Sequence, residues 1–217
     1  MHTRTQTLAT IALALATVLA GCGFLLGSNS LVFSSSKATV SDDAVSATGY
    51  HETNVSTKNV TKQFSAAGQT RNVTVVNYLA KYERRVELGP FETNKRAAVF
   101  AVFASPEVKV ADQTLNPIKD YSERDILQQF DSQYSGIDVG KKVDTKTVSA
   151  LGKNRSVSKF NGTAKLAGQD VDVYIQASKF KHEGDFIAVV AIYPQDAPNE
   201  EDKVTTLFGG LSHSGDS

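Results

Sequence analysis

Few residues of this 217-residue chain have the types and spacing that chemistry requires. There is one cysteine, Cys22, and the four histidines include His182 and His213. Neither a Gly-x-Ser-x-Gly nucleophile elbow nor a His-Glu-x-x-His zinc motif occurs in the sequence. His182 next to Glu183 can act as a base, but Lys181–Asp185 is more typical of the hydrophilic end of a hairpin. We therefore predict no catalytic residue, no metal site and no cofactor.

The other ionisable candidates also have simpler structural interpretations. Asp170 and Asp172 lie on one face of a predicted strand, where they can bind Ca²⁺ or face solvent, and we favour exposure to solvent. His213 begins a Gly- and Ser-rich end of the chain, and we predict that residues 213–217 form a disordered tail. None of these residues indicates a reaction.

Cys22 has the surroundings of a lipid-attachment site. Arg4 precedes an apolar run from Leu8 to Ala20, which has the length of a secretory signal core. Small residues before the cysteine fit cleavage in front of Cys22 and acylation of its thiol. The four positions resemble the bacterial and archaeal lipobox: Leu19, Ala20, Gly21 and Cys22. Residues 1–21 are thus predicted to be a lipoprotein signal peptide, and residues 22–38 the lipidated cysteine with a flexible tether.

An uncleaved membrane helix is the alternative, because the sequence stays apolar from Leu8 to Gly27, about 20 residues. The only cysteine lies at the lipobox position, which a plain helix would not require, and this favours lipidation. Both alternatives place most of the protein outside the cell, held at the cell membrane. The 23 basic and 23 acidic side chains cancel. This balance argues against a nucleic-acid partner. It also means that the protein surface is not attracted to anionic lipids, so the anchor alone must hold the protein at the membrane.

Residues 39–212 have the pattern of an α+β domain. Helices are predicted at 41–49, at 122–134 with Ser122 and Asp125 as reciprocal caps, and after Pro198 with Val204, Leu207 and Phe208 buried. Strands are predicted at 55–64, 71–88, 97–105 and 186–193, with the apolar segment 97–104 covered on both faces. Leu31–Phe33 belongs either to the tether or to an edge strand.

The second half of the domain repeats features of the first. Ala167-Gly168-Gln169 repeats Ala67-Gly68-Gln69, and each half contains an apolar strand that ends at a proline. This suggests two related α-β-β-β halves, about 39–118 and 119–212, although short strands share such patterns by chance. We expect an antiparallel β-sheet, single or divided, with amphipathic helices packed on one face.

Five Asn-x-Ser/Thr triplets are candidate N-glycosylation sites in an exported protein. Strand-rich sequences also form such triplets through their serine and threonine content alone. Asn161, followed by Gly162, is the most turn-like of the five. The candidate acceptors are Asn54, Asn59, Asn72, Asn154 and Asn161.

Characteristic segments of this sequence are the lipobox and residues 40–44, 49–50, 80–84, 97–102, 115–117 and 167–174. In these segments the sequence resembles an uncharacterised family of lipid-anchored exported proteins of haloarchaea. The resemblance spans nearly the whole chain and implies no known activity. Unlike most proteins of salt-loving organisms, this chain has no acidic excess. The element order is also similar to small exported proteins of the Mog1/PsbP type.

These observations lead to a functional expectation without a named ligand. We expect an exported, lipid-anchored and outward-facing envelope lipoprotein that is not an enzyme. Its domain would be a non-catalytic binding or structural module for an unknown protein or small molecule. The alternatives are an accessory subunit of a membrane transporter or enzyme, and an extracytoplasmic hydrolase whose acid and base meet only in the fold.

Overall fold

The computed structural model describes residues 30–66, 69–88, 91–110, 113–114, 116–131, 136–166 and 169–214. These residues divide into two compact units, one containing Thr61–Thr74 with the chain up to Val32, and the other containing Phe33–Val60 and Val75–Ser217. In the first unit, cross-strand hydroxyl contacts of 2.9 Å join Thr61 to Thr74 and Ser65 to Thr70. The features below belong to the second unit except where strands continue into the first.

One eight-stranded sheet forms most of the fold. Its strand order is β1-β4-β5-β11-β10-β9-β8, with β3 paired to β4. The question of one sheet or two is thereby settled in favour of one, and the expected α+β class with antiparallel strands is confirmed. The strands are β1 (Leu31–Ser34), β3 (His51–Ala66), β4 (Gln69–Leu88), β5 (Phe91–Pro106), β8 (Ile137–Ala150), β9 (Lys153–Leu166), β10 (Gln169–His182) and β11 (Asp185–Pro194).

Two short pairs of strands lie outside this sheet. β2 (Lys37–Val40) pairs with β12 (Leu211–Ser214), which brings the two ends of the domain together. β6 (Lys109–Val110) pairs with β7 (Gln113–Thr114).

β5 and β11 pair at the centre of the sheet, and all ten residues of β11 are buried. Alternate residues of β11 enter two separate apolar clusters: Ile187 and Val189 lie in one, and Ala188 and Val190 in the other. Because side chains alternate across a strand, the sheet has a core on each face. The prediction that 97–104 lies in the middle of the sheet is confirmed.

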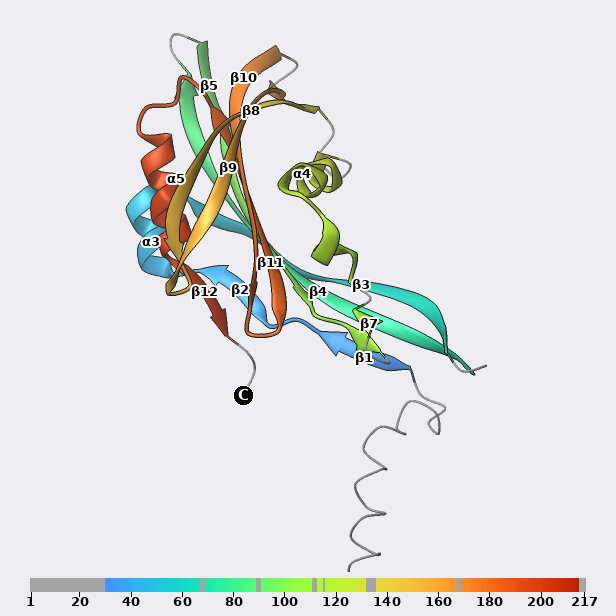
Figure 1. Ribbon diagram of the computed structural model, residues 1–217. Coiled ribbons are helices and arrows are strands. Elements are labelled where there is room, and N and C mark those ends of the chain that lie inside the picture. The colour runs from blue at the N-terminus through green and yellow to red at the C-terminus, as the bar shows by residue number, and fades with distance from the viewer. Residues whose placement is uncertain are drawn as a thin grey trace, which may run out of the picture. The chain divides into compact units, whose positions relative to one another are not determined.

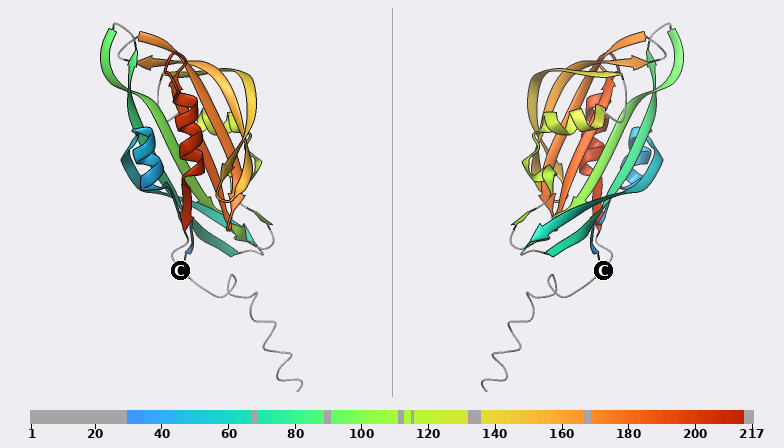
Figure 2. Two further views of the ribbon diagram at one scale, coloured as in Figure 1. Left: turned by 90° about the vertical axis from the view of Figure 1, so that its left-hand side faces the viewer. Right: turned by 90° about the vertical axis from the view of Figure 1, so that its right-hand side faces the viewer.

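The helices cover both faces. α3 (Asp42–Thr48) and α5 (Glu200–Gly209) lie side by side over one face, and α4 (Glu123–Asp131) lies over the other (Figures 1 and 2). The expected packing on a single face therefore applies to α3 and α5 only. Ile126 and Leu127 of α4 pack into the second apolar cluster, which a one-face arrangement would have left uncovered. A 3₁₀ helix, η2 (Pro117–Asp120), precedes α4.

Local signals fix where these helices begin and end. Ser122 and Asp125 cap α4 reciprocally, because Ser122 N donates to Asp125 Oδ2 at 2.7 Å and Asp125 N donates to Ser122 Oγ at 3.2 Å. α3 ends at Gly49, whose φ of 70° is a left-handed conformation that glycine adopts without strain. Val204, Leu207 and Phe208 of α5 are fully buried, as predicted.

Two boundaries differ from the sequence-based expectation. Leu31–Ser34 forms edge strand β1, and Lys37 and Ala38 belong to β2, so the structure favours the edge-strand alternative over a tether that reaches residue 38. His213 and Ser214 belong to β12, so the disordered tail predicted from 213 does not begin there. The internal duplication stays a prediction, although β3-β4-β5 and β9-β10-β11 are arranged in the same order on either side of the β5–β11 pair.

Candidate functional site

The predicted lipid-attachment site lies outside the described residues. This concerns Cys22 and the lipobox positions Leu19, Ala20 and Gly21. Within the part of the chain that the structure describes, no helix has the length and apolar character needed to cross a membrane.

The candidate glycan acceptors all lie on strands. Asn54 and Asn59 of β3, Asn72 of β4 and Asn154 of β9 are exposed. Asn161 is half-buried in β9, and its Oδ1 accepts a hydrogen bond of 2.6 Å from Lys141 N. The expected turn at Asn161 is therefore wrong, because the backbone there pairs with β10 on one side and β8 on the other.

A cluster of histidines and carboxylates forms where β10 and β11 meet. β10 ends at His182 opposite Asp185, and Glu183 and Gly184 form the two-residue turn between them. Both turn residues have positive φ, 46° and 87°, as a type I′ hairpin requires. The pairing of β12 with β2 places His213 beside this turn. We call His182, Glu183, Asp185 and His213 the histidine cluster.

The imidazoles of the histidine cluster face each other through like atoms. His182 Nδ1 lies 3.1 Å from His213 Nδ1, and Glu183 Oε2 lies 3.9 Å and 4.0 Å from these two nitrogens. The side chain of His213 is fully buried and that of His182 is 17% exposed, whereas that of Glu183 is 65% exposed. The cluster therefore opens to solvent on the side of Glu183.

Asp185 orients His213 from the buried side of the cluster. His213 Nε2 lies 3.0 Å from Asp185 Oδ2, which also accepts a hydrogen bond of 2.7 Å from Ser36 N. An Nε2–H that donates to this carboxylate leaves the lone pair of His213 Nδ1 directed at His182. Burial lowers the pKa of His182, and this outweighs the raising effect of Glu183, so His182 is neutral at neutral pH.

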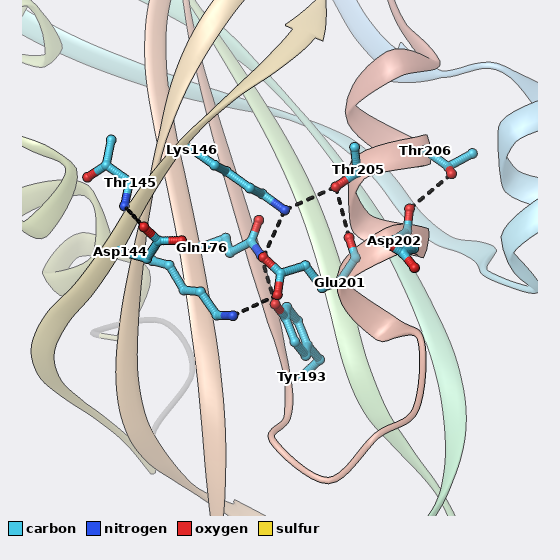
Figure 3. A network of polar contacts seen from close by, with 10 residues as sticks. Asp144, Thr145, Lys146, Gln176, Tyr193, Glu201, Asp202, Thr205 and Thr206 are labelled. Carbon is cyan, nitrogen blue, oxygen red and sulfur yellow. Dashed lines mark hydrogen bonds and ion pairs between the residues drawn. The ribbon is translucent and has the colours of Figure 1, made fainter.

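A second polar group, the Glu201 network, links α5 to the sheet (Figure 3). Glu201 forms ion pairs of 3.0 Å with Lys146 of β8 and 2.7 Å with Lys159 of β9. Lys146 also donates to Thr205 at 3.0 Å. Burial raises the pKa of Glu201, the hydrogen bonds from Lys159 and Lys146 lower it, and the net change is a lowering. These contacts indicate that Glu201 has a structural role, which is to hold α5 against the sheet.

The buried end of the Glu201 network is Gln176, whose side chain is fully buried. Its Nε2 donates to the Tyr193 hydroxyl at 2.7 Å and to Glu201 Oε1 at 3.5 Å. Its Oε1 makes no hydrogen bond to any described residue. The network thus continues from the surface charges into the core and fixes β10, β11 and α5 relative to one another.

Comparison with known families identifies the domain. Residues 37–212 match the model of a domain of unknown function (DUF6517). The chain belongs to the DUF6517 family. The prediction of an uncharacterised family is thereby confirmed at this level, whereas the haloarchaeal and lipid-anchored assignment stays a prediction. Most of the histidine cluster lies inside the matched range of the DUF6517 domain, and His213 directly follows its last residue.

Comparisons with individual proteins add little to the DUF6517 assignment. No curated protein matches this chain. Among solved structures, the solution structure of cyanobacterial PsbP (CyanoP) from Synechocystis sp. PCC 6803 is similar, with 12% identity and a TM-score of 0.36. The match covers 88% of this chain and 100% of that chain.

Sequence reasoning located three of the four residues of the histidine cluster and misplaced the fourth, His213. The interpretation of 181–185 as the end of a hairpin is correct, but it treated His182 and Glu183 as surface groups. The histidine cluster also needs His213, which we predicted to lie in a disordered tail because the residues after it are rich in glycine and serine. The alternation of the large side chains Leu211 and His213 with the small Ser212 and Ser214 is a period-two pattern that could have indicated a strand here.

The acidic pairs lie as expected. Asp170 and Asp172 are exposed on β10, and Asp170 pairs with Lys165 at 3.4 Å with both side chains mostly in solvent. Asp42 and Asp43 are in the first turn of α3. The positions of Asp170 and Asp172 support their interpretation as solvent-facing groups. The carboxylates of Asp42 and Asp43 lie where they complement the dipole of α3.

Proposed function

We propose that this DUF6517 protein is an exported lipoprotein, held at the outer face of the cell membrane by lipid on Cys22, whose domain is a non-catalytic binding module. One observation carries the proposal: the only cysteine of the chain follows Leu19-Ala20-Gly21 at the end of an apolar export signal. If the Cys22 thiol is needed only for lipid attachment, this explains why the cysteine lies at this position and why the chain has no other.

The charge balance indicates what kind of anchor is needed. With 23 basic and 23 acidic groups the chain gains little from anionic headgroups. Each buried methylene contributes about 0.8 kcal/mol, and one acyl chain alone gives only reversible binding. We therefore propose a lipid with more than one chain at Cys22.

The polar chemistry of the domain supports the binding role. In the histidine cluster, two imidazole nitrogens and a solvent-exposed carboxylate converge, and such a group of polar atoms can recognise a ligand. The Glu201 network, by contrast, satisfies its charges internally and serves to position α5. The histidine cluster is thus the part of the domain that we assign to ligand binding.

Fractionation and mass spectrometry of Cys22→Ser beside the wild type test the anchor, with Ser28→Ala as a control that leaves the lipobox intact. The wild type and the control should be found in the membrane fraction, begin at residue 22 and carry the mass of a lipid. Cys22→Ser should lose that mass and keep its signal peptide or leave the membrane. Identical processing, retention and mass in wild type and Cys22→Ser would refute the proposal, and an intact N-terminus on the wild type would indicate the uncleaved helix instead.

An extracytoplasmic hydrolase is the second candidate, and the convergence of His182 and His213 with the carboxylates of Glu183 and Asp185 is what favours it. Such a group can activate water as a general base. Assays of the full chain with ester, phosphate-ester and peptide substrates would decide. Turnover that His182→Ala abolishes would favour the hydrolase, whereas no turnover with any substrate class would favour the binding module.

A further inference from the structure

The donor atoms of the histidine cluster have the spacing of metal ligands. Ligands at about 2.0–2.1 Å from a tetrahedral metal ion lie about 3.3 Å from each other. The two Nδ1 atoms are 3.1 Å apart, close to this value, and Glu183 Oε2 at 3.9–4.0 Å needs to approach by about 0.6 Å. The Glu183 side chain is 65% exposed and can make this movement.

We propose that His182 Nδ1, His213 Nδ1 and the Glu183 carboxylate bind one divalent transition-metal ion of the Zn²⁺ type, with the fourth position open to water or a ligand. Two nitrogen donors and one carboxylate suit Zn²⁺, Ni²⁺ and Cu²⁺, whereas Mg²⁺ and Ca²⁺ require oxygen donors. This inference names the ligand class of the binding module and in that sense rests on the proposed function.

Asp185 has the position of the residue that supports a metal-bound histidine. Histidines that bind a metal through one ring nitrogen commonly donate the other N–H to a carboxylate. Here His213 Nε2 lies 3.0 Å from Asp185 Oδ2, and the backbone N–H of Ser36 holds the same oxygen at 2.7 Å. The buried carboxylate therefore keeps the proton of His213 on the nitrogen that faces away from the site.

The contact between the two Nδ1 atoms specifies the proton change on binding. Without metal, the Nδ1 of His182 carries the hydrogen and donates it to the lone pair of His213 Nδ1 at 3.1 Å. With metal, both lone pairs must face the ion, so His182 carries its hydrogen on Nε2 instead. In this exchange the hydrogen leaves one nitrogen of His182 and the other nitrogen takes one up. Because the His182 side chain is 17% exposed, water can carry out this exchange.

The backbone of Glu183 supplies an independent argument. Its φ of 46° is left-handed, and the first position of a type I′ turn is normally Asn, Asp or Gly. A residue chosen for the turn alone would not be glutamate, whereas the third ligand of an ion bound by His182 and His213 needs a carboxylate on a side chain long enough to reach that ion. Glu183→Asn therefore separates the two roles, because it suits the turn and removes the long carboxylate.

Titration calorimetry with Zn²⁺ and visible absorption with Co²⁺ test the site on the full chain in detergent. We expect one ion per chain and the absorption bands of tetrahedral Co²⁺ in the wild type. His182→Ala should weaken binding by at least about 100-fold, and Asp185→Asn by about 10- to 100-fold. Glu183→Asn should weaken binding by about 10-fold and at the same time raise the melting temperature of the metal-free protein. His51→Ala, which removes an exposed histidine of β3, is the matched control.

Three results would contradict the proposed metal site. The proposal is overturned if the wild type binds no Zn²⁺ at one per chain, if His182→Ala and Glu183→Asn bind as tightly as the wild type, or if His51→Ala loses as much affinity as they do. His213 is fully buried, so the test relies on the more exposed His182 and Glu183, with circular dichroism to verify the fold. Cys22→Ser is titrated in parallel, because it separates the two proposals. If Zn²⁺ binding is unchanged and the anchor test fails, the lipoprotein proposal is refuted and the metal-site proposal is not.

Discussion

Replacing Glu200 with alanine should destabilise the domain strongly. The Glu200 side chain is fully buried at the start of α5 and forms an ion pair with Arg84 of β4. Glu200 Oε1 also accepts hydrogen bonds of 2.8 Å from the Tyr50 hydroxyl and 3.3 Å from Arg84 Nε. Burial and the adjacent Glu200 raise the pKa of Tyr50, so its hydroxyl remains a donor. One carboxylate thus holds α5, β4 and Tyr50, the residue after the C-cap of α3.

The magnitude follows from what the substitution leaves behind. Removing one partner of a buried ion pair costs about 3–5 kcal/mol, because the other charge stays buried and unpaired. The Arg84 side chain is 19% exposed, and partial access to water places the expected loss near the lower limit, about 3 kcal/mol. For a domain of this size each kcal/mol lowers the melting temperature by about 2–4 °C, which gives a decrease of about 6–12 °C.

Thermal and urea unfolding of the full chain measure this effect. Asp202→Ala is the matched control, because Asp202 is an exposed carboxylate in the same first turn of α5. It should change stability by less than about 0.5 kcal/mol. The double replacement of Glu200 and Arg84 by methionine should recover much of the loss, since no charge is then left buried. A melting temperature for Glu200→Ala within about 2 °C of the wild type would refute the reasoning.

Three further substitutions test other parts of the fold. Gly162→Ala should cost about 1–3 kcal/mol in urea unfolding, because its Cβ would lie 2.4 Å from the carbonyl oxygen of Asp138 in β8. Phe208→Ala should cost about 3–5 kcal/mol in the same assay, because the ring is fully buried with its edge against Phe100 at a centroid distance of 5.4 Å. The lowered pKa of Glu201 means that its ion pairs stabilise the fold above the usual carboxyl pKa range, and that this contribution disappears as pH falls through the lowered pKa. The difference in melting temperature between the wild type and Glu201→Gln should therefore be present at pH 7 and vanish in strong acid.

The parts of the fold that sequence could predict depend on residues close together in the chain. The reciprocal cap of α4 involves residues three apart, Ser122 and Asp125. The unbroken apolar segment 97–104 identifies a strand that is covered on both faces, and the stripe of Val204, Leu207 and Phe208 identifies the buried side of α5. In each case burial or capping is decided by the period of the local pattern.

The parts that could not be predicted depend on which distant segments meet. The face that α4 covers is fixed by its packing against β10 and β8, and nothing within the helix itself specifies it. The histidine cluster requires Leu211–Ser214 to pair with Lys37–Val40 across almost the whole domain. Local composition assigned His213 and Ser214 of β12 to a disordered tail, and Lys37 and Ala38 of β2 to a tether. Both errors have the same cause. Each of these strands has only four residues and is stabilised by pairing with the other, so neither segment has a strong strand pattern of its own.

This dependence also bears on the proposed metal site. β2 and β12 are short, and Ser36 N, immediately before β2, is hydrogen-bonded to the carboxylate that orients His213. A metal ion bound by His182, His213 and Glu183 would therefore join the end of the chain to the β10–β11 hairpin at the point where the domain begins. The free energy of binding would contribute to holding β12 in place, since ligand binding to the folded state alone stabilises that state. Anchoring and metal binding would then act on neighbouring segments of the chain, Cys22 upstream of Ser36 and the histidine cluster in contact with it.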